Sequence, residues 1–277
     1  MLVTFYGVRG SIPTPGAEFV KYGGNTACVH IALDDGTNIV LDSGTGIRNL
    51  GKQLIQINSP IHLLLSHNHW DHIQGFPFFA PLYQPGREIY ITPGLTDEHR
   101  PEGILEQMNG SFFPVPREAL AANVEIQQYD EDSWMIGDAK IHRLLMNHPG
   151  GGSCYSIEYK NRKLAYITDN ELYPPYKKNT DFLDFVTFAK DADLLIHDAQ
   201  YVIQDMPEKS GWGHSVAEEA VKLSLACDVK QLALYSHDPE REDHLIDEIV
   251  DNASFIIEVG GGKTVCFGAK EGLSLKL

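Results

Sequence analysis

The stretch Ser66-His67-Asn68-His69-Trp70-Asp71-His72 places three histidines and an aspartate within six residues of one another. It directly follows the apolar run Ile61-His62-Leu63-Leu64-Leu65, whose length and composition predict a short buried strand. Imidazole nitrogens and carboxylate oxygens are ligands that zinc accepts without redox chemistry. Because a tight turn lets the first two histidines point one way and the aspartate and last histidine another, the stretch predicts two adjacent metal ions.

The composition is that of a globular protein with a sizeable core. The chain has 277 residues, of which 43% are hydrophobic and 22% are charged, as in ordinary soluble domains. No run of about 18 apolar residues occurs, so we expect neither a membrane span nor a membrane partner. The first residues lack the basic start and long apolar region of a signal peptide. The four cysteines contain no C-x-x-C pair, which favours reduced thiols in a cytoplasmic protein.

The charge balance bears on the kind of substrate. The formal net charge is −16. A surface this acidic repels long nucleic acids unless a local basic patch intervenes. Bound divalent cations would offset part of the charge at one cleft. The balance therefore favours a small substrate over a polymer.

Apolar runs separated by turn residues predict most of the secondary structure. The predicted strands are residues 3–8, 27–33, 38–42, 61–65, 88–92, 140–146, 154–159, 163–168, 194–196 and 232–235. The predicted helices are residues 45–57, 215–226 with Ser215 as the N-cap, and 243–252. The turn Asp34-Asp35-Gly36 predicts a hairpin. Strands followed by helices in each half indicate two packed sheets with helices outside, within one domain spanning 1–277.

Residues 93–123 have a loose pattern that leaves two interpretations open. They contain Phe112 and Phe113 within a stretch rich in proline and glycine. One interpretation is a surface excursion with a single buried aromatic pair. The other is a lid whose two phenylalanines wall a pocket.

Further polar residues stand where predicted strands stop. His148 follows the strand that ends at Met146, Asp169 follows Thr168, and His237 follows the strand that ends at Tyr235. Side chains at the ends of neighbouring strands can converge on one edge of the sheets, so we expect these three to join the first cluster.

Together these residues form the pattern H-x-H-x-D-H followed by a distant His, Asp and His, and the chain resembles the metallo-β-lactamase superfamily. The resemblance covers nearly the whole chain and implies an α/β fold, the four-layer αββα sandwich. It also implies two divalent ions, Zn²⁺ foremost, although these ligands accept Mn²⁺ or Fe²⁺ as well. The implied ligand sets are His67, His69 and His148 for one ion, Asp71, His72 and His237 for the other, and Asp169 as the bridge.

Two later motifs narrow the resemblance to a phosphodiesterase branch. Gly213-His214-Ser215 is similar to the His-Ser-Thr motif of the tRNA 3′-end-processing ribonucleases (tRNase Z), and His197-Asp198-Ala199-Gln200 is similar to their His-Glu-Ala-Thr motif. The resemblance implies that His214 protonates or stabilises the reacting phosphoryl group, that Asp198 orients it, and that Asp71 shares in proton handling. Phosphodiester cleavage needs such an acid, because an alkoxide leaves and negative charge builds up.

The chain also departs from the tRNA-processing enzymes. Their tRNA-gripping arm lies between the third histidine and the bridging aspartate, an interval that two predicted strands fill here. Their early basic Pro-x-Lys-x-Arg-Asn signature is replaced by Pro13-Thr14-Pro15-Gly16. The nearest resemblance is to armless phosphodiesterases of small substrates, such as cyclic nucleotides, although Cys28 alone is insufficient for the structural zinc site found in some of them.

We therefore predict a dinuclear metal-dependent hydrolase of small or cyclic nucleotide-like phosphodiesters. Two alternatives stay open at this point. A carboxylic ester, thioester or lactone hydrolase would use the same metals without needing His214, because metals alone polarise a carbonyl group. A non-catalytic sensor would bind a nucleotide or an oxidant through the metal pair. The resemblance further implies a homodimer as the candidate assembly.

Overall fold

The computed structural model describes residues 1–277, and its strands form two seven-stranded sheets. The first sheet has the order β14 (Ser274–Lys276), β1 (Leu2–Gly7), β2 (Cys28–Ala32), β3 (Asn38–Leu41), β4 (Ile61–Leu64), β5 (Glu88–Thr92) and β6 (Asn123–Ile126). The second has the order β13 (Val265–Gly268), β12 (Gln231–Tyr235), β11 (Leu194–Asp198), β10 (Arg162–Ile167), β9 (Ser153–Tyr159), β8 (Ala139–Leu145) and β7 (Ser133–Ile136).

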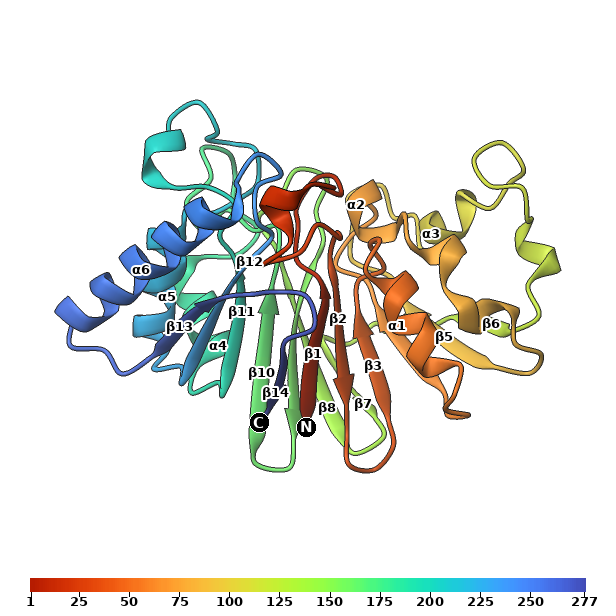
Figure 1. Cartoon of the computed structure of the whole chain (residues 1–277). Coiled ribbons are helices and arrows are strands. Elements are labelled where there is room, and N and C mark those ends of the chain that lie inside the picture. Colours follow the sequence, from red (N-terminus) through yellow and green to blue (C-terminus); the bar gives the residue numbers. More distant parts are fainter.

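Each sheet has an antiparallel part and a parallel part. From β14 to β3 the pairs are antiparallel, and from β3 to β6 they are parallel. The second sheet repeats this arrangement, with antiparallel pairs from β7 to β10 and parallel pairs from β10 to β13. Antiparallel pairing of β1 with β14 brings the two ends of the chain together, as Figure 1 shows at the foot of the molecule.

Helices cover the outer face of each sheet (Figure 1). The α-helices are α1 (Ile47–Leu54), α2 (Trp70–Ile73), α3 (Gly103–Glu106), α4 (Phe182–Ala189), α5 (Ala217–Ala226) and α6 (Asp243–Val259). Short 3₁₀ helices are η1 (Ala17–Phe19), η2 (Phe76–Phe78), η3 (Ala80–Tyr83), η4 (Arg117–Ala119) and η5 (Ile203–Asp205). None of the helices combines the length and the apolar composition needed to cross a membrane.

Three apolar clusters define the four layers. The largest holds buried side chains of both sheets, such as Phe5 and Tyr166, and forms the core between them. A second cluster joins the outer face of the second sheet to α4, α5 and α6. The third joins the outer face of the first sheet to α1, η2, η3 and α3. This αββα sandwich confirms the fold predicted from the sequence.

The start of α5 and the course of residues 93–123 are among the places where the structure differs from the sequence prediction. The helix predicted from Ser215 begins at Ala217, and Ser215 does not cap it. Its hydroxyl instead donates to the carbonyl of Asn170 at 2.6 Å. The loose segment 93–123 contains α3 and η4, and Ile104 and Met108 pack into the apolar cluster of the first sheet. The segment is therefore anchored at its middle, while Phe112 at its tip is 76% exposed.

Candidate metal centre

The polar cluster lies at one end of the sandwich, where strands of both sheets stop. His67, His69 and His72 follow β4 of the first sheet, and His148, Asp169 and His214 lie beyond β8, β10 and β11 of the second. Asp169 adopts a left-handed backbone conformation with a φ of 45°. Such a conformation costs free energy in a residue with a side chain and tends to occur at functional sites. Here it turns the chain directly after β10.

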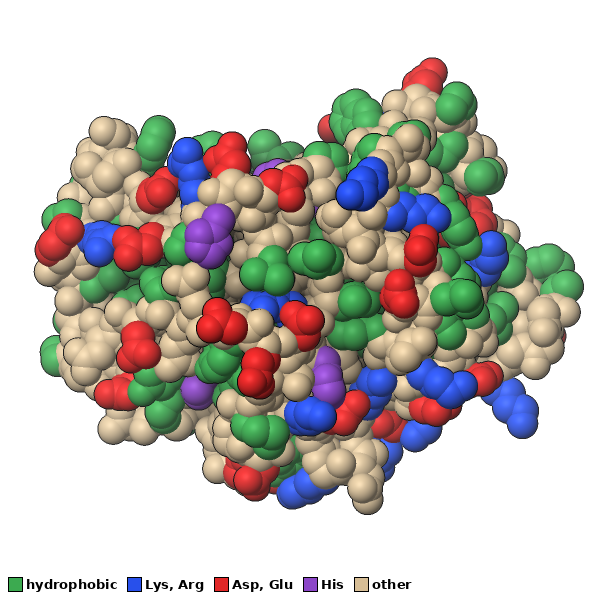
Figure 2. Space-filling view, turned by 180° about the vertical axis from the view of Figure 1, so that it is seen from behind, with side chains coloured by type: hydrophobic (Ala, Val, Ile, Leu, Met, Phe, Trp, Pro, Cys, Tyr) green, Lys and Arg blue, Asp and Glu red, His purple; other side chains and the backbone are tan.

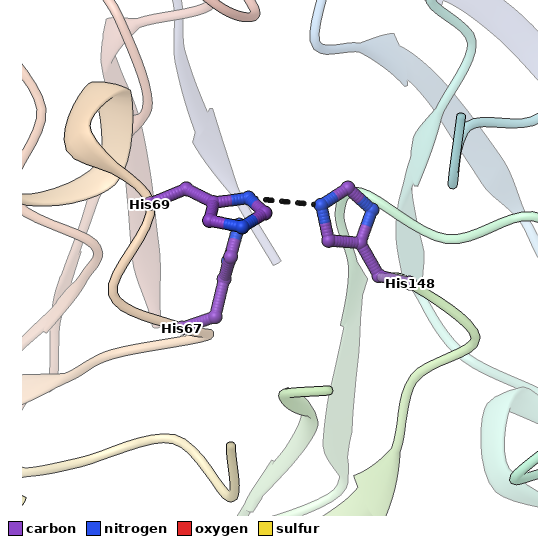
Figure 3. Close-up of side chains that lie close together, drawn as sticks. All are labelled: His67, His69 and His148. Atoms are coloured by element: carbon purple, nitrogen blue, oxygen red, sulfur yellow. Dashed lines mark hydrogen bonds between the residues drawn. The ribbon is translucent and has the colours of Figure 1, made fainter. Parts of the chain in front are cut away.

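The first group of potential ligands is a histidine trio. The ligand atoms of His67, His69 and His148 all lie within 4.8 Å of one another. Figure 3 shows the three rings facing one another, with Nδ1 of His69 3.0 Å from Nε2 of His148. His69 is exposed, whereas the other two are buried. The trio thus forms a nitrogen-lined site that opens to solvent on one side.

Asp169 stands at the centre of two further groups. Its carboxylate lies with His67 and His72 in one, and with His148 and His214 in the other, again within 4.8 Å. Its Oδ2 is 3.1 Å from Nε2 of His72 and 3.8 Å from Nε2 of His67. A carboxylate placed between two ligand groups has the position that a bridging ligand needs.

Hydrogen bonds from Nδ1 hold two of the imidazole rings of the cluster in place. His148 donates from Nδ1 to the carbonyl of Gly213 at 2.8 Å, and His72 donates from Nδ1 to Asp42 at 2.9 Å. Each bond fixes the ring and directs Nε2 toward the other residues of the cluster. Asp42 is fully buried and also accepts from Ser66 and Tyr166. The sequence prediction missed Asp42, although it too ends a predicted strand in an apolar context.

These residues fit a divalent metal. Burial lowers the pKa of His67 well below its usual range and lowers that of His148 to about 4, so both rings are neutral near pH 7. Neutral imidazole is the form that binds metal. The Nε2 atom of His67 is buried and has no hydrogen-bond partner. An unsatisfied buried nitrogen is costly, and an ion held by the trio would satisfy it.

His214 and Asp198 pair as the sequence suggested. Nδ1 of His214 donates to Oδ2 of the fully buried Asp198 at 2.6 Å, and the His214 ring lies 5.2 Å from that of His148. Burial alone would lower the pKa of His214, but the charges of Asp198 and Asp169 and the hydrogen bond to Asp198 raise it to about 9. The pairing directs Nε2 of His214 toward the metal-ligating groups.

Asp71 lies at the edge of the cluster. Its Oδ2 is 3.4 Å from Nε2 of His72 and accepts the backbone N–H of Ser11 at 2.8 Å. It belongs to none of the tight ligand groups. Its roles as a ligand and in proton handling stay predictions.

The structure does not bring His237 to the cluster, which differs from the ligand set expected from the sequence. Ser236 has a φ of 58°, and the chain turns there so that His237 pairs with the segment around Arg9. The His237 ring donates from Nε2 to the carbonyl of Ala269 at 2.8 Å and packs edge-on against Tyr22. His214 occupies the place beside Asp169 that His237 was expected to take.

Replacing Asp42 with asparagine should weaken metal binding by about 10- to 100-fold, the usual effect of losing a carboxylate behind a ligating histidine. The amide cannot accept from both His72 and Tyr166 in the way the carboxylate does. Competition for Zn²⁺ against a chelator measures the change. Asp193→Asn is the matched control, because Asp193 is buried at another strand edge and pairs with Lys230. Equal affinities in the two variants would contradict the role given to Asp42.

Two pockets adjoin the motif at Asn68. One, of about 250 Å³, lies over His67 and His69 and is rimmed by polar residues that include Arg100. The other, of about 430 Å³, is the aromatic pocket, lined by Trp70, Phe78, Phe112 and Phe113 together with Asn68 and Gln107. Asn68 lines both. The two hollows therefore meet at a residue that lies between two histidines of the trio.

The chain is similar in sequence and in fold to several known proteins. The family model described as "Beta-lactamase superfamily domain" matches residues 37–237. A ribonuclease Z from Thermoplasma volcanium is 34% identical over 91% of this chain and 91% of its own length. Among solved structures, the metallo-β-lactamase fold protein YhfI from Bacillus subtilis has a TM-score of 0.71 at 18% identity, covering 99% of this chain and 98% of that one. A diphosphatase of the PhnP family has a TM-score of 0.70 at 17% identity, covering 100% and 97%.

Proposed function

The chain belongs to the metallo-β-lactamase superfamily and is a metal-dependent hydrolase, and we propose that it hydrolyses small phosphodiesters with a pair of divalent ions, foremost zinc. The observation that carries the proposal is the contact of 2.6 Å between His214 and the buried Asp198, beside His148 and Asp169. Metal ions alone can polarise a carbonyl group, whereas a protonated histidine so placed can both stabilise the more negative phosphoryl centre and protonate its leaving alkoxide.

The roles of the residues follow from their positions. A bound pair of divalent ions supplies a water of lowered pKa and stabilises negative charge on the phosphoryl group. His67, His69 and His148 would hold one ion, and His72 with Asp169 would hold the other. Asp198 keeps Nδ1 of His214 protonated, so that Nε2 is the atom that gives a proton to the leaving oxygen. Asp169 would join the two ions.

The strands next to the candidate metal centre and the charge of the protein favour a small substrate. Residues 149–168, where the tRNA-gripping arm would stand, are largely occupied by the adjacent antiparallel strands β9 and β10. The net charge of −16 disfavours a polyanion. On the face that Figure 2 shows, Lys and Arg side chains are interspersed with Asp and Glu. The ribonuclease Z relatives act on RNA by name, so RNA is the comparison that tests this part of the proposal.

The aromatic pocket suggests which part of the substrate is recognised. Glu106 is its single charged lining residue, so it suits a neutral group rather than the phosphate. Phe113 packs edge-on against Phe78 with ring centroids 5.3 Å apart, whereas Trp70 and Phe112 are largely exposed. Exposed rings beside a pocket offer stacking surfaces to a planar substituent. We therefore place an apolar or aromatic substituent of the ester there.

Replacing Phe112 with alanine should raise KM for bis(p-nitrophenyl) phosphate by about fivefold to tenfold, since about 1 kcal/mol of aromatic contact is lost. KM for methyl p-nitrophenyl phosphate, whose methyl group does not fill the pocket, should change less. Steady-state kinetics with both esters measure the difference. Phe255→Ala is the control, because Phe255 is also exposed but lies on α6. An equal effect of Phe112→Ala on both esters would contradict the assignment of the pocket.

The proposal is tested by assaying the zinc-loaded protein on a phosphodiester, a lactone, a thioester and a structured RNA side by side. We expect the small phosphodiester to have the highest kcat/KM. Faster turnover of lactone or thioester, unaffected by His214→Ala, would replace the proposal with a carbonyl hydrolase. Faster cleavage of RNA would overturn the small-substrate part, and no turnover of any class would favour a sensor. A homodimer and a cytoplasmic location stay predictions.

A further inference from the structure

The segment between β11 and α5 is held by one buried carboxylate. Glu171 is only 3% exposed and lies two residues after Asp169. Its Oε1 accepts the backbone N–H of Gly211 at 2.9 Å, and its Oε2 accepts that of Gly213 at 3.0 Å. Bonds from backbone N–H groups to a carboxylate are charge-assisted and stronger than neutral ones. Glu171 therefore fixes the backbone immediately before His214.

The same backbone contacts a metal ligand on its other side. The Gly213 carbonyl accepts from Nδ1 of His148 at 2.8 Å. Gly213 has a φ of 88°, and a Cβ atom built on it would lie 2.2 Å from Nδ1 of His148. Only glycine permits this close approach. The position of the His148 ring thus depends on where the Gly213 peptide lies.

Glu171 also holds the other side of His148. Its backbone N–H donates to the carbonyl of Asn147 at 2.9 Å, directly before His148. The next residue, Leu172, donates from its N–H to the hydroxyl of Ser215, directly after His214. The segment that begins at Asp169 is therefore bonded to the chain beside both histidines.

We propose that Glu171 is a positioning residue. Through the Gly211–Gly213 backbone, it fixes the positions of the metal ligand His148 and the proton donor His214 relative to Asp169. The role of His214 rests on the proposed function, whereas the role of His148 rests on metal binding alone. Both carboxylate oxygens accept backbone N–H groups, so Glu171 acts through its neighbours rather than as a ligand.

The first test uses metal-free protein and hydrogen exchange. In Glu171→Ala, the amides of Gly211 and Gly213 should exchange about 10- to 100-fold faster, because the bonds that protect them are gone. Glu171→Gln keeps an acceptor oxygen and should restore most of the protection. Glu219→Gln is the matched control, because burial and then the nearby charge of Glu171 raise the pKa of Glu219 to about 7, yet Glu219 does not bond the segment. Unchanged exchange in Glu171→Ala would overturn the proposal.

The second test measures Zn²⁺ affinity by chelator competition. Glu171→Ala should bind Zn²⁺ about 10- to 100-fold more weakly, which is the usual effect of removing a group that supports a ligating histidine. Glu171→Gln should bind Zn²⁺ with nearly the affinity of the wild type. Gly213→Ala keeps the carboxylate but displaces His148, so it should show the same loss. Wild-type affinity in both Glu171→Ala and Gly213→Ala, or an equal loss in Glu219→Gln, would overturn the proposal. Neither hydrogen exchange nor Zn²⁺ affinity requires turnover. If the protein does not hydrolyse phosphodiesters, these two measurements still test whether Glu171 has the positioning role.

Kinetics complete the test. In zinc-saturated Glu171→Ala, kcat for the small phosphodiester should fall about 10-fold or more, with KM within about twofold of wild type, because positioning affects the reacting atoms rather than uniform binding. Should Glu171→Ala fail to fold, Glu171→Gln and Gly213→Ala carry the comparison. A proportionate rise in KM with kcat unchanged would contradict the proposal.

Discussion

His214→Ala is expected to lower kcat for hydrolysis of phosphodiesters with alkyl leaving groups by about 10²- to 10⁴-fold, the range for loss of a positioned general acid. The ring sits beside Asp169 and His148, and its other nitrogen is held by Asp198. Without the imidazole, the alkoxide must leave unprotonated. The loss should therefore be largest for alkyl leaving groups and small for p-nitrophenolate, which leaves readily as an anion.

The leaving-group series is the sharpest form of this experiment. Steady-state kcat is measured for esters with leaving groups of increasing pKa, and zinc content is measured in the same samples. His142→Ala is the control, since His142 lies on β8 away from the cluster. A uniform loss across the series with reduced zinc content would show that His214 is a metal ligand, which its place in a ligand group also permits.

Asp169→Ala is expected to remove most of the metal-dependent stabilisation and to reduce bound zinc below about two ions per chain. The wild-type carboxylate contacts both ligand groups, so its loss weakens both sites together. At a zinc concentration 100 times the dissociation constant, each bound ion adds about 2.7 kcal/mol to the free energy of unfolding. The variant should lose most of this increment.

Unfolding by denaturant, with zinc and with a chelator, measures that increment directly. Elemental analysis of the same samples gives the number of ions. In the chelator, Asp169→Ala and wild type should differ much less, because His72 keeps its contacts with Asp42 and Asp71. Two ions and a full zinc-dependent increment in the variant would remove Asp169 as the bridge.

The strands that the sequence analysis missed are those at the edges of the two sheets. β14 and β6 border the first sheet, and β13 and β7 border the second. The central strands are buried on both faces, so they stand out as apolar runs. β6 and β14 have no fully buried residue. Their composition is therefore close to that of a loop, and their strand character comes from the neighbour with which they pair.

Part of the site could be predicted from the sequence, because several of its residues directly follow apolar strands. A polar residue after an apolar strand marks the sheet end where it lies, and this correctly grouped His148 and Asp169 with the three histidines of the H-x-H-x-D-H stretch. The direction in which such a side chain points depends on one backbone torsion. At Ser236 that torsion is left-handed, and His237 faces Ala269 instead. The roles of Glu171 and Asp42 could not be predicted, because they depend on contacts between distant segments that a single sequence does not reveal.

The proposed metal centre would draw its ligands from both sheets, and this would affect how the two sheets are held together. His67, His69 and His72 belong to the end of the first sheet, whereas His148 and Asp169 belong to the second. Ligands gathered on one ion from distant parts of a chain act as a cross-link, as a disulfide does. Zinc would therefore link the ends of the two sheets, in addition to the apolar core that already packs them together.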